Sequence, residues 1–150
     1  YKLSAIRRPG GEWEPRVKVS EQAAKVTTPG LLRVRRYADA AGLFTGDMIY
    51  DELAAPVGDC VMVDPADATR RTSYCGADAA EELLVPVFAD GRLVYDVPPL
   101  AESRQRTLDQ LSHLDPSHRR FLNPHVYKVG VELGLHERKM ALIRAARGVD

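Results

Sequence analysis

A hairpin signal in the middle of the chain limits what this sequence can fold into. Asp90-Gly91 separates two apolar runs, residues 83–88 and 93–97. The pattern predicts a tight β-hairpin, because a type I′ turn needs positive φ at both central residues. Pro98-Pro99 then ends the second strand, since proline has no N–H to donate to a sheet ladder.

A helical pattern follows the prolines. Pro99 can open a helix, where its missing N–H is no loss. Apolar residues and one arginine then recur at spacings of three and four: Leu100, Arg104, Leu108, Leu111 and Leu114. This spacing predicts a helix over 100–114. Asp115-Pro116 reads as a cap with a first-turn proline.

The remaining elements are expected on both sides of this segment. Six strands are expected, at residues 1–6, 16–20, 31–37, 43–50, 59–63 and 69–74, together with a helical turn over 20–25. A final helix is expected over 132–147, with Gly148 as its stop. The sequence predicts one α+β domain over 1–150: mostly antiparallel strands and hairpins in the first two-thirds, and helices at the C-terminal end.

Charge and hydropathy exclude some classes of protein. The chain has 21 Lys+Arg and 21 Asp+Glu, so we expect neither nucleic-acid binding nor an anionic membrane partner. No apolar run approaches the roughly 20 residues of a membrane helix, and there is no signal peptide. Cys60 and Cys75 favour two reduced thiols in a cytoplasmic protein, with a disulfide or metal pair as the alternative.

Common catalytic motifs are missing from the sequence. It lacks GxGxxG, GxxxxGK[ST], HExxH and GxSxG. His113 and His118 are five apart across an expected helix break, so they do not share a face as metal ligands would. We therefore expect no catalytic residue and no metal site within this chain.

One polar cluster is suited to phosphate. Lys18, Ser20, Lys25 and Thr27, followed by Thr28, combine ammonium and hydroxyl groups, which bind phosphate oxygens. Turns and helix starts also expose N–H groups that suit anions. The alternative is a solvated loop in which the hydroxyls cap local turns.

Two further clusters have both a chemical and a structural interpretation. Residues 119–125 could stack a base, but we expect Phe121 and Leu122 to anchor this linker to the core. Asp47, Asp51 and Glu52 could form an acid/base set. Strand alternation places the two aspartates on one face and Glu52 on the other, and we expect a solvated strand end.

Several stretches, in order, resemble the C-terminal region of nicotinate phosphoribosyltransferases. They are Tyr1-Lys2-Leu3, the residues from Lys18 to Gly30, Gly46 to Glu52, and the stretch from 83 to 129 with its Asp90-Gly91 turn and its His118 to His125 run. The set spans most of the chain but only the last third of such an enzyme. Pro99 and Glu132 stand where the family often has a capping serine, which puts local helix capping in doubt.

The resemblance implies an activity for a parent enzyme. Such enzymes join nicotinate to 5-phosphoribosyl 1-diphosphate in pyridine nucleotide salvage, giving nicotinate mononucleotide for NAD biosynthesis, and are classed as ligases or glycosyltransferases. ATP and Mg²⁺ take part, ATP through a transiently phosphorylated histidine. The family has an irregular α/β barrel and is usually a homodimer.

The motifs for phosphohistidine, nicotinate clamp and phosphate loops precede the matched region, so no catalytic residue carries over. We expect a structural segment, inactive alone, with the barrel segment as its partner. Residues 1–50 would border the barrel, and 81–150 would form the hairpin and helices. A strand starting at Tyr1 would lack an upstream neighbour, which suggests a piece of a longer polypeptide. The alternatives are a free-standing interaction module, or a small nucleotide- or phosphate-binding protein using Lys18, Lys25 and Arg119.

Overall fold

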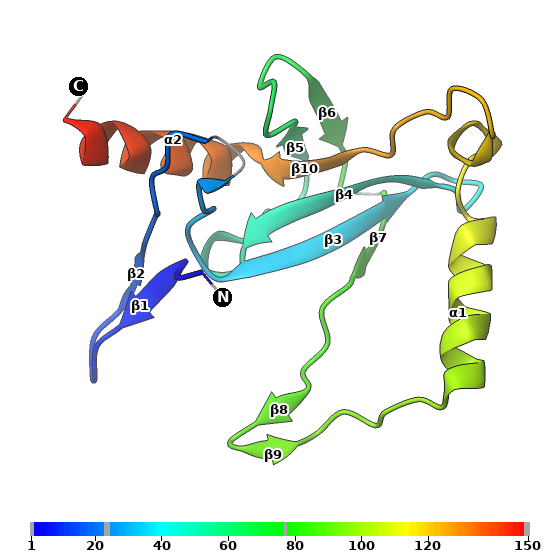
Figure 1. Cartoon of the computed structure of the whole chain (residues 1–150), viewed down its shortest axis with the longest axis horizontal. Helices are drawn as coiled ribbons and strands as arrows, with labels where there is room; N and C mark the ends of the chain where they lie inside the picture. The colour runs from blue at the N-terminus through cyan, green and yellow to red at the C-terminus, as the bar shows by residue number, and fades with distance from the viewer. Residues whose placement is uncertain (1, 23–24, 77, 149–150) are drawn as a thin grey trace.

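A six-stranded sheet forms the body of the chain, seen here in a computed structural model that describes residues 2–22, 25–76 and 78–148 (Figure 1). The strand order is β6-β5-β10-β4-β3-β7. Its strands are β3 (Leu32–Ala38), β4 (Phe44–Asp51), β5 (Cys60–Val63), β6 (Arg71–Tyr74), β7 (Ala79–Glu82) and β10 (Val129–Glu132). The β10–β4 pair is parallel and the other pairs are antiparallel, so the α+β expectation is confirmed.

Two strands of this sheet were not expected from the sequence. β7 reads Ala-Ala-Glu-Glu and is exposed throughout, so it has no alternation to detect. It is a strand because it pairs with β3, where Arg35 binds Glu82 at 2.7 Å. β10 is four residues long and is placed between β4 and β5 by long-range pairing. The strands predicted at 31–37, 43–50, 59–63 and 69–74 are confirmed as β3, β4, β5 and β6 within a few residues.

One cluster of buried core residues is rich in aromatic and sulfur side chains, and Val63, Val131, Leu135 and Ile143 are buried as well. Tyr37 and Tyr74 stack with ring centroids 3.8 Å apart, beside the buried Met48 and Met62. The Tyr37 hydroxyl is 3.1 Å from the buried Cys60 sulfur. Cys60 and the exposed Cys75 are both free thiols.

The final helix, α2 (Leu133–Arg147), packs against β5 and β10. The Glu132 carboxylate caps its N-terminus by accepting from the backbone N–H groups of Gly134 at 2.8 Å and Leu135 at 2.7 Å. Gly148 ends the helix with a φ of 64°, so the predicted helix and stop are confirmed. Glu132 therefore caps the helix, because its carboxylate accepts the N–H bonds that a capping serine hydroxyl would accept.

The N-terminal strands differ from those expected. β1 (Ala5–Arg7) pairs with β2 (Trp13–Pro15), so the strand predicted at 16–20 is wrong. After Pro15 only one bond continues the pairing, from the Arg16 N–H to the Ser4 carbonyl at 2.8 Å. Tyr1, and residues 23–24 of the expected helical turn, lie outside the described residues. Lys25 is in a 3₁₀ turn, and its N–H donates to Gln22.

The central hairpin has the predicted turn but much shorter strands. Asp90 and Gly91 have φ of 49° and 74°, which confirms the turn. β8 (Phe88–Ala89) and β9 (Arg92–Leu93) pair, and a bond from the Val94 N–H to the Val87 carbonyl at 2.9 Å extends the hairpin, so strands filling 83–88 and 93–97 are wrong. The Leu83 N–H donates to the Val34 carbonyl of β3 at 2.9 Å, and the hairpin beyond it lies away from the six-stranded sheet (Figure 1). We call residues 83–99 the arm.

Helix α1 (Leu100–Ser112) follows the arm and confirms the predicted helix, two residues shorter. Pro99 is its N-cap and makes no side-chain capping bond. The described residues also include the 3₁₀ helices η2 (Glu52–Ala54) and η3 (Pro116–Arg119), the latter capped by Asp115. Phe121 is 99% exposed and Leu122 is 76% exposed, so the expectation that they anchor the linker is wrong. Within the described residues, no helix has the length and apolar character to cross a membrane.

The placement of β10 can be tested at Gly130. A Cβ there would lie 2.6 Å from the Val63 carbonyl and would also clash with Met62. Because β10 is bonded on both sides, we expect Gly130→Ala to destabilise the chain by roughly 1–3 kcal/mol in urea unfolding. Gly11→Ala is the control, since its Cβ would meet the Arg8 carbonyl at an ordinary 3.5 Å. Equal stability of the two variants would show that β10 is misplaced.

Candidate functional site

The predicted polar cluster forms a closed loop. The Thr27 hydroxyl is buried and accepts from the Lys18 N–H at 2.7 Å, and the Thr27 N–H donates to the Lys18 carbonyl at 3.2 Å. The Ser20 hydroxyl accepts from the Gln22 N–H at 3.3 Å. These two hydroxyls are therefore used inside the loop, whereas the side chains of Lys18 and Lys25 are exposed.

The exit of the loop is fixed by contacts on both sides of Gly30. Gly30 has a φ of 107°, and its N–H donates to the Ser4 carbonyl at 2.9 Å. A Cβ on Gly30 would lie 2.7 Å from the Asp51 carboxylate, so the close approach requires glycine. Pro29 before it is fully buried. The Pro29-Gly30 pair thus ends the loop in one defined position.

Asp51 joins this loop to the rest of the fold. Its carboxylate is 3% exposed, accepts from the backbone N–H groups of Leu31 at 3.1 Å and Leu53 at 3.2 Å, and forms an ion pair with Arg138 of α2. The expectation of a solvated strand end is wrong for Asp51, because the loop and α2 both cover the end of β4. It is correct for Glu52, which is exposed and pairs with Arg33 at 3.1 Å.

Helix α2 adds a second contact to the loop. The Lys139 ammonium donates to the Thr28 hydroxyl at 3.2 Å, and burial lowers the pKa of Lys139 below its ordinary value. Sequence reasoning missed Arg138 and Lys139. A signal was present, because both lie three or four residues after Leu135, on the face of α2 that this fully buried leucine marks.

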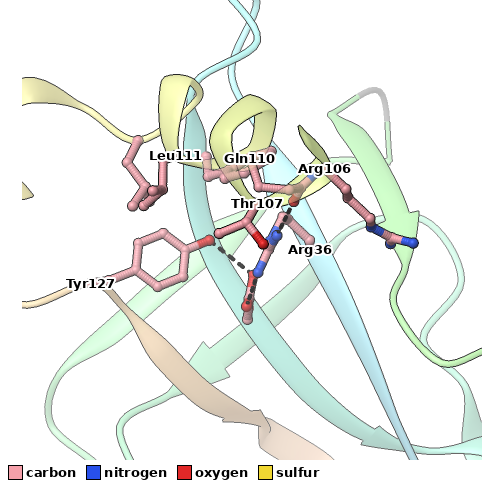
Figure 2. Close-up of a pocket in the computed structure, with 9 residues that line it drawn as sticks. Arg36, Arg106, Thr107, Gln110, Leu111 and Tyr127 are labelled. Carbon is pink, nitrogen blue, oxygen red and sulfur yellow. Dashed lines mark hydrogen bonds and ion pairs between the residues drawn. The ribbon is translucent and has the colours of Figure 1, made fainter. Parts of the chain in front are cut away.

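A pocket lies between α1 and the face of the sheet that carries Asp47 (Figure 2). Its volume is about 430 Å³, and it is lined by Arg36, Phe44, Asp47, Arg106, Thr107, Gln110, Leu111, Leu114 and Tyr127. These residues come from β3, β4, α1 and the segment before β10. The pocket is mostly apolar, with a polar group at its base.

A bidentate ion pair forms the base of the pocket. The Arg36 guanidinium donates to the two Asp47 oxygens at 2.8 and 2.7 Å, and the Tyr127 hydroxyl donates to Asp47 at 2.9 Å (Figure 2). Arg36 also donates to the Gln110 amide oxygen at 2.6 Å. Asp47 is 9% exposed, so the solvated interpretation is wrong for it as well. The groups that cover this ion pair come from far along the chain: Gln110 is 74 residues after Arg36, and Tyr127 is 80 residues after Asp47.

This arrangement is suited to holding α1, not to proton transfer. Both Asp47 oxygens are occupied, and burial together with the bond to Asp47 raises the pKa of Tyr127. The Arg36 guanidinium also lies over the Phe44 ring, 4.5 Å from its centroid. The His113 ring stacks on the same Phe44 ring, with centroids 5.2 Å apart. Across the described ranges no three His, Cys, Asp or Glu side chains are grouped to hold a metal ion.

Comparison with known proteins gives a consistent result. A family model for the nicotinate phosphoribosyltransferase C-terminal domain matches residues 33–139. Human nicotinate phosphoribosyltransferase is 34% identical over 147 residues, covering 97% of this chain and 26% of that protein. Nicotinate phosphoribosyltransferase 2 of Arabidopsis thaliana is 32% identical over 130 residues, covering 83% of this chain and 23% of that protein.

The fold matches a solved structure as well. The crystal structure of human nicotinic acid phosphoribosyltransferase aligns with a TM-score of 0.65 at 28% identity, over 92% of this chain and 27% of that one. This chain therefore spans about a quarter of the length of the curated relatives it matches.

The role of Asp51 can be tested by removing its charge. Asp51→Asn keeps the size of the side chain but removes the charge that Arg138 and two backbone N–H groups bind, and we expect a loss of roughly 1.5–3 kcal/mol in unfolding free energy. Glu52→Gln is the control, because that neighbouring pair is exposed and we expect a melting temperature near that of wild type. Similar melting temperatures for the two variants would contradict a central role for Asp51.

Proposed function

This chain belongs to the nicotinate phosphoribosyltransferase C-terminal domain family, and from that premise we propose that it is the C-terminal portion of a nicotinate phosphoribosyltransferase. The complete enzyme would join nicotinate to 5-phosphoribosyl 1-diphosphate and release nicotinate mononucleotide and diphosphate in NAD salvage. The observation that carries this proposal is a family match over 33–139 in a chain that covers about a quarter of its relatives.

The contacts of the acidic residues support a structural role for the chain itself. Stabilising an oxocarbenium-like centre and its diphosphate needs preorganised donors and usually Mg²⁺. Asp47 and Asp51 are already bonded to Arg36 and Arg138. We therefore place the catalytic groups, and the binding of ATP and Mg²⁺, in the portion of the enzyme outside this chain.

The finer properties of the complete enzyme are part of the same proposal. We propose ATP coupling, a homodimer and a cytoplasmic location, as the family resemblance implies. The exposed side chains of Lys18 and Lys25 keep the small phosphate-binding protein as a second candidate. Measurable binding of phosphoribosyl diphosphate to the 150-residue chain would favour that candidate.

We predict that the chain alone shows no phosphoribosyl transfer. Purified chain is incubated with nicotinate, phosphoribosyl diphosphate, Mg²⁺ and ATP, and nicotinate mononucleotide is measured. We expect the level of a no-protein blank, with the complete enzyme as positive control. Turnover clearly above the blank would show that the chain contains catalytic groups.

We further propose that the Lys18–Gly30 loop lies near the substrate phosphates, at the boundary with the portion outside this chain. Lys18 and Lys25 expose two ammonium groups on a loop whose exit is held by Ser4 and Asp51. A fixed loop can present charge at a defined place, and ligand sites concentrate where domains meet. The loop would then aid substrate binding without touching the reacting atoms.

A further prediction concerns Lys25 in the complete enzyme. A distant positive charge aids ground-state binding more than chemistry, so Lys25→Ala should raise KM for phosphoribosyl diphosphate several-fold with little change in kcat. Lys128→Ala is the control, since this exposed lysine lies beside β10. A loss of about a thousandfold in kcat at unchanged KM would place Lys25 on the reacting atoms. No change in either constant would favour a solvated loop.

A further inference from the structure

The arm and α1 expose large apolar side chains in a continuous stretch of chain. Phe88 is 69% exposed, Val97 is 69% exposed and Leu100 is 85% exposed. Scattered apolar residues are normal on a protein surface, but a contiguous set marks an interaction site. The arm is the clearest such set in the described part of this chain.

The arm is apolar on both of its sides. Leu84 and Val85 are neighbours, and their exposed fractions are 46% and 53%. Successive side chains of extended backbone point to opposite sides, so a partner lying against one side would leave the other exposed. The arm therefore fits a partner that encloses it.

The arm also lacks the pairing needed to hold its own shape. Its hairpin pairs two residues of β8 with two of β9. A two-stranded hairpin is marginal in water even when it is longer. The segments on both sides of β8–β9 run outside the six-stranded sheet (Figure 1), and several of their apolar side chains are exposed. External contacts must supply the missing support.

Helix α1 also has little packing against the rest of this chain. None of its thirteen residues is buried, and Leu108 and Leu111 are 44% and 45% exposed. It is held near its C-terminal end, where Gln110 accepts from Arg36 and the His113 carbonyl accepts from the Phe44 N–H at 2.8 Å. An amphipathic helix gains most of its stability from packing its apolar face. The Leu100 end of α1 thus has an apolar face to offer to a partner.

We propose that the arm and α1 form the surface on which the catalytic portion of the same polypeptide docks. This rests on the proposed function, because it takes the occupant to be the part of the enzyme outside this chain. That part makes up about three-quarters of the relatives' length, enough to enclose the arm. A second copy is the other candidate occupant, and the crosslinking below distinguishes the two.

Photo-crosslinking in the complete polypeptide tests the docking. The crosslinking amino acid p-benzoylphenylalanine replaces Phe88 in one variant, Leu100 in a second, and Val57 in a third as control. Val57 is 94% exposed, but it lies in the loop before β5 and is not part of the arm or α1. After irradiation, crosslinked peptides are identified by mass spectrometry.

We expect Phe88 and Leu100 positions to crosslink to peptides outside the 150-residue chain, and the Val57 position to crosslink weakly. Crosslinks confined to peptides within the chain would show that the catalytic portion does not cover the arm, and would overturn the proposal. Crosslinking no stronger than at Val57 would overturn it too, because the arm would then be free in solvent.

Two further measurements separate this proposal from the proposed function. Amide hydrogen exchange of the arm should be at least about tenfold slower in the complete polypeptide than in the chain alone, and equal rates would overturn the docking. Phosphoribosyl transfer is assayed on the same complete polypeptide. An inactive polypeptide with the expected crosslinks would refute the function and leave the docking intact, and an active one without them would do the reverse.

Discussion

The fold depends on one buried carboxylate at the end of β4. Asp51 accepts from the Leu31 N–H on the strand entry, from Leu53 in the following 3₁₀ turn, and from Arg138 on α2. Gly30 has to be glycine because the same carboxylate occupies the space of a side chain. The Lys18–Gly30 loop, the sheet and the final helix are thus joined at one carboxylate, and removing its charge weakens all of these hydrogen bonds together.

A second carboxylate on β4, that of Asp47, links the sheet to the other helix. Asp47 binds Arg36 and Tyr127, and Arg36 reaches Gln110 on α1. Strand β4 therefore holds α2 through Asp51 and α1 through Asp47, on one face of the sheet. Both aspartates are therefore fully engaged in holding the elements of this chain together.

The loop and the arm are the two parts of the chain that expose groups suited to an external partner. The loop has a fixed exit and two exposed ammonium groups, which suits a site completed by another part of the enzyme. The arm is apolar on both sides and barely paired, which suits burial within that other part. Both features are physically incomplete in a chain that spans about a quarter of its relatives' length.

The sequence by itself determined the features that depend on local backbone chemistry. The Asp90-Gly91 turn, the helix after Pro99 and the Gly148 stop follow from residue-specific φ preferences and spacing. Tertiary structure decided what depends on partners far away in the chain. The pairs Asp47–Tyr127 and Asp51–Arg138 are separated by 80 and 87 residues, so nothing local marks either aspartate as buried. In the same way β7 and β10 are strands only because β3, β4 and β5 lie beside them. The arm leaves the six-stranded sheet after Leu83, whose N–H still donates to the Val34 carbonyl of β3 at 2.9 Å.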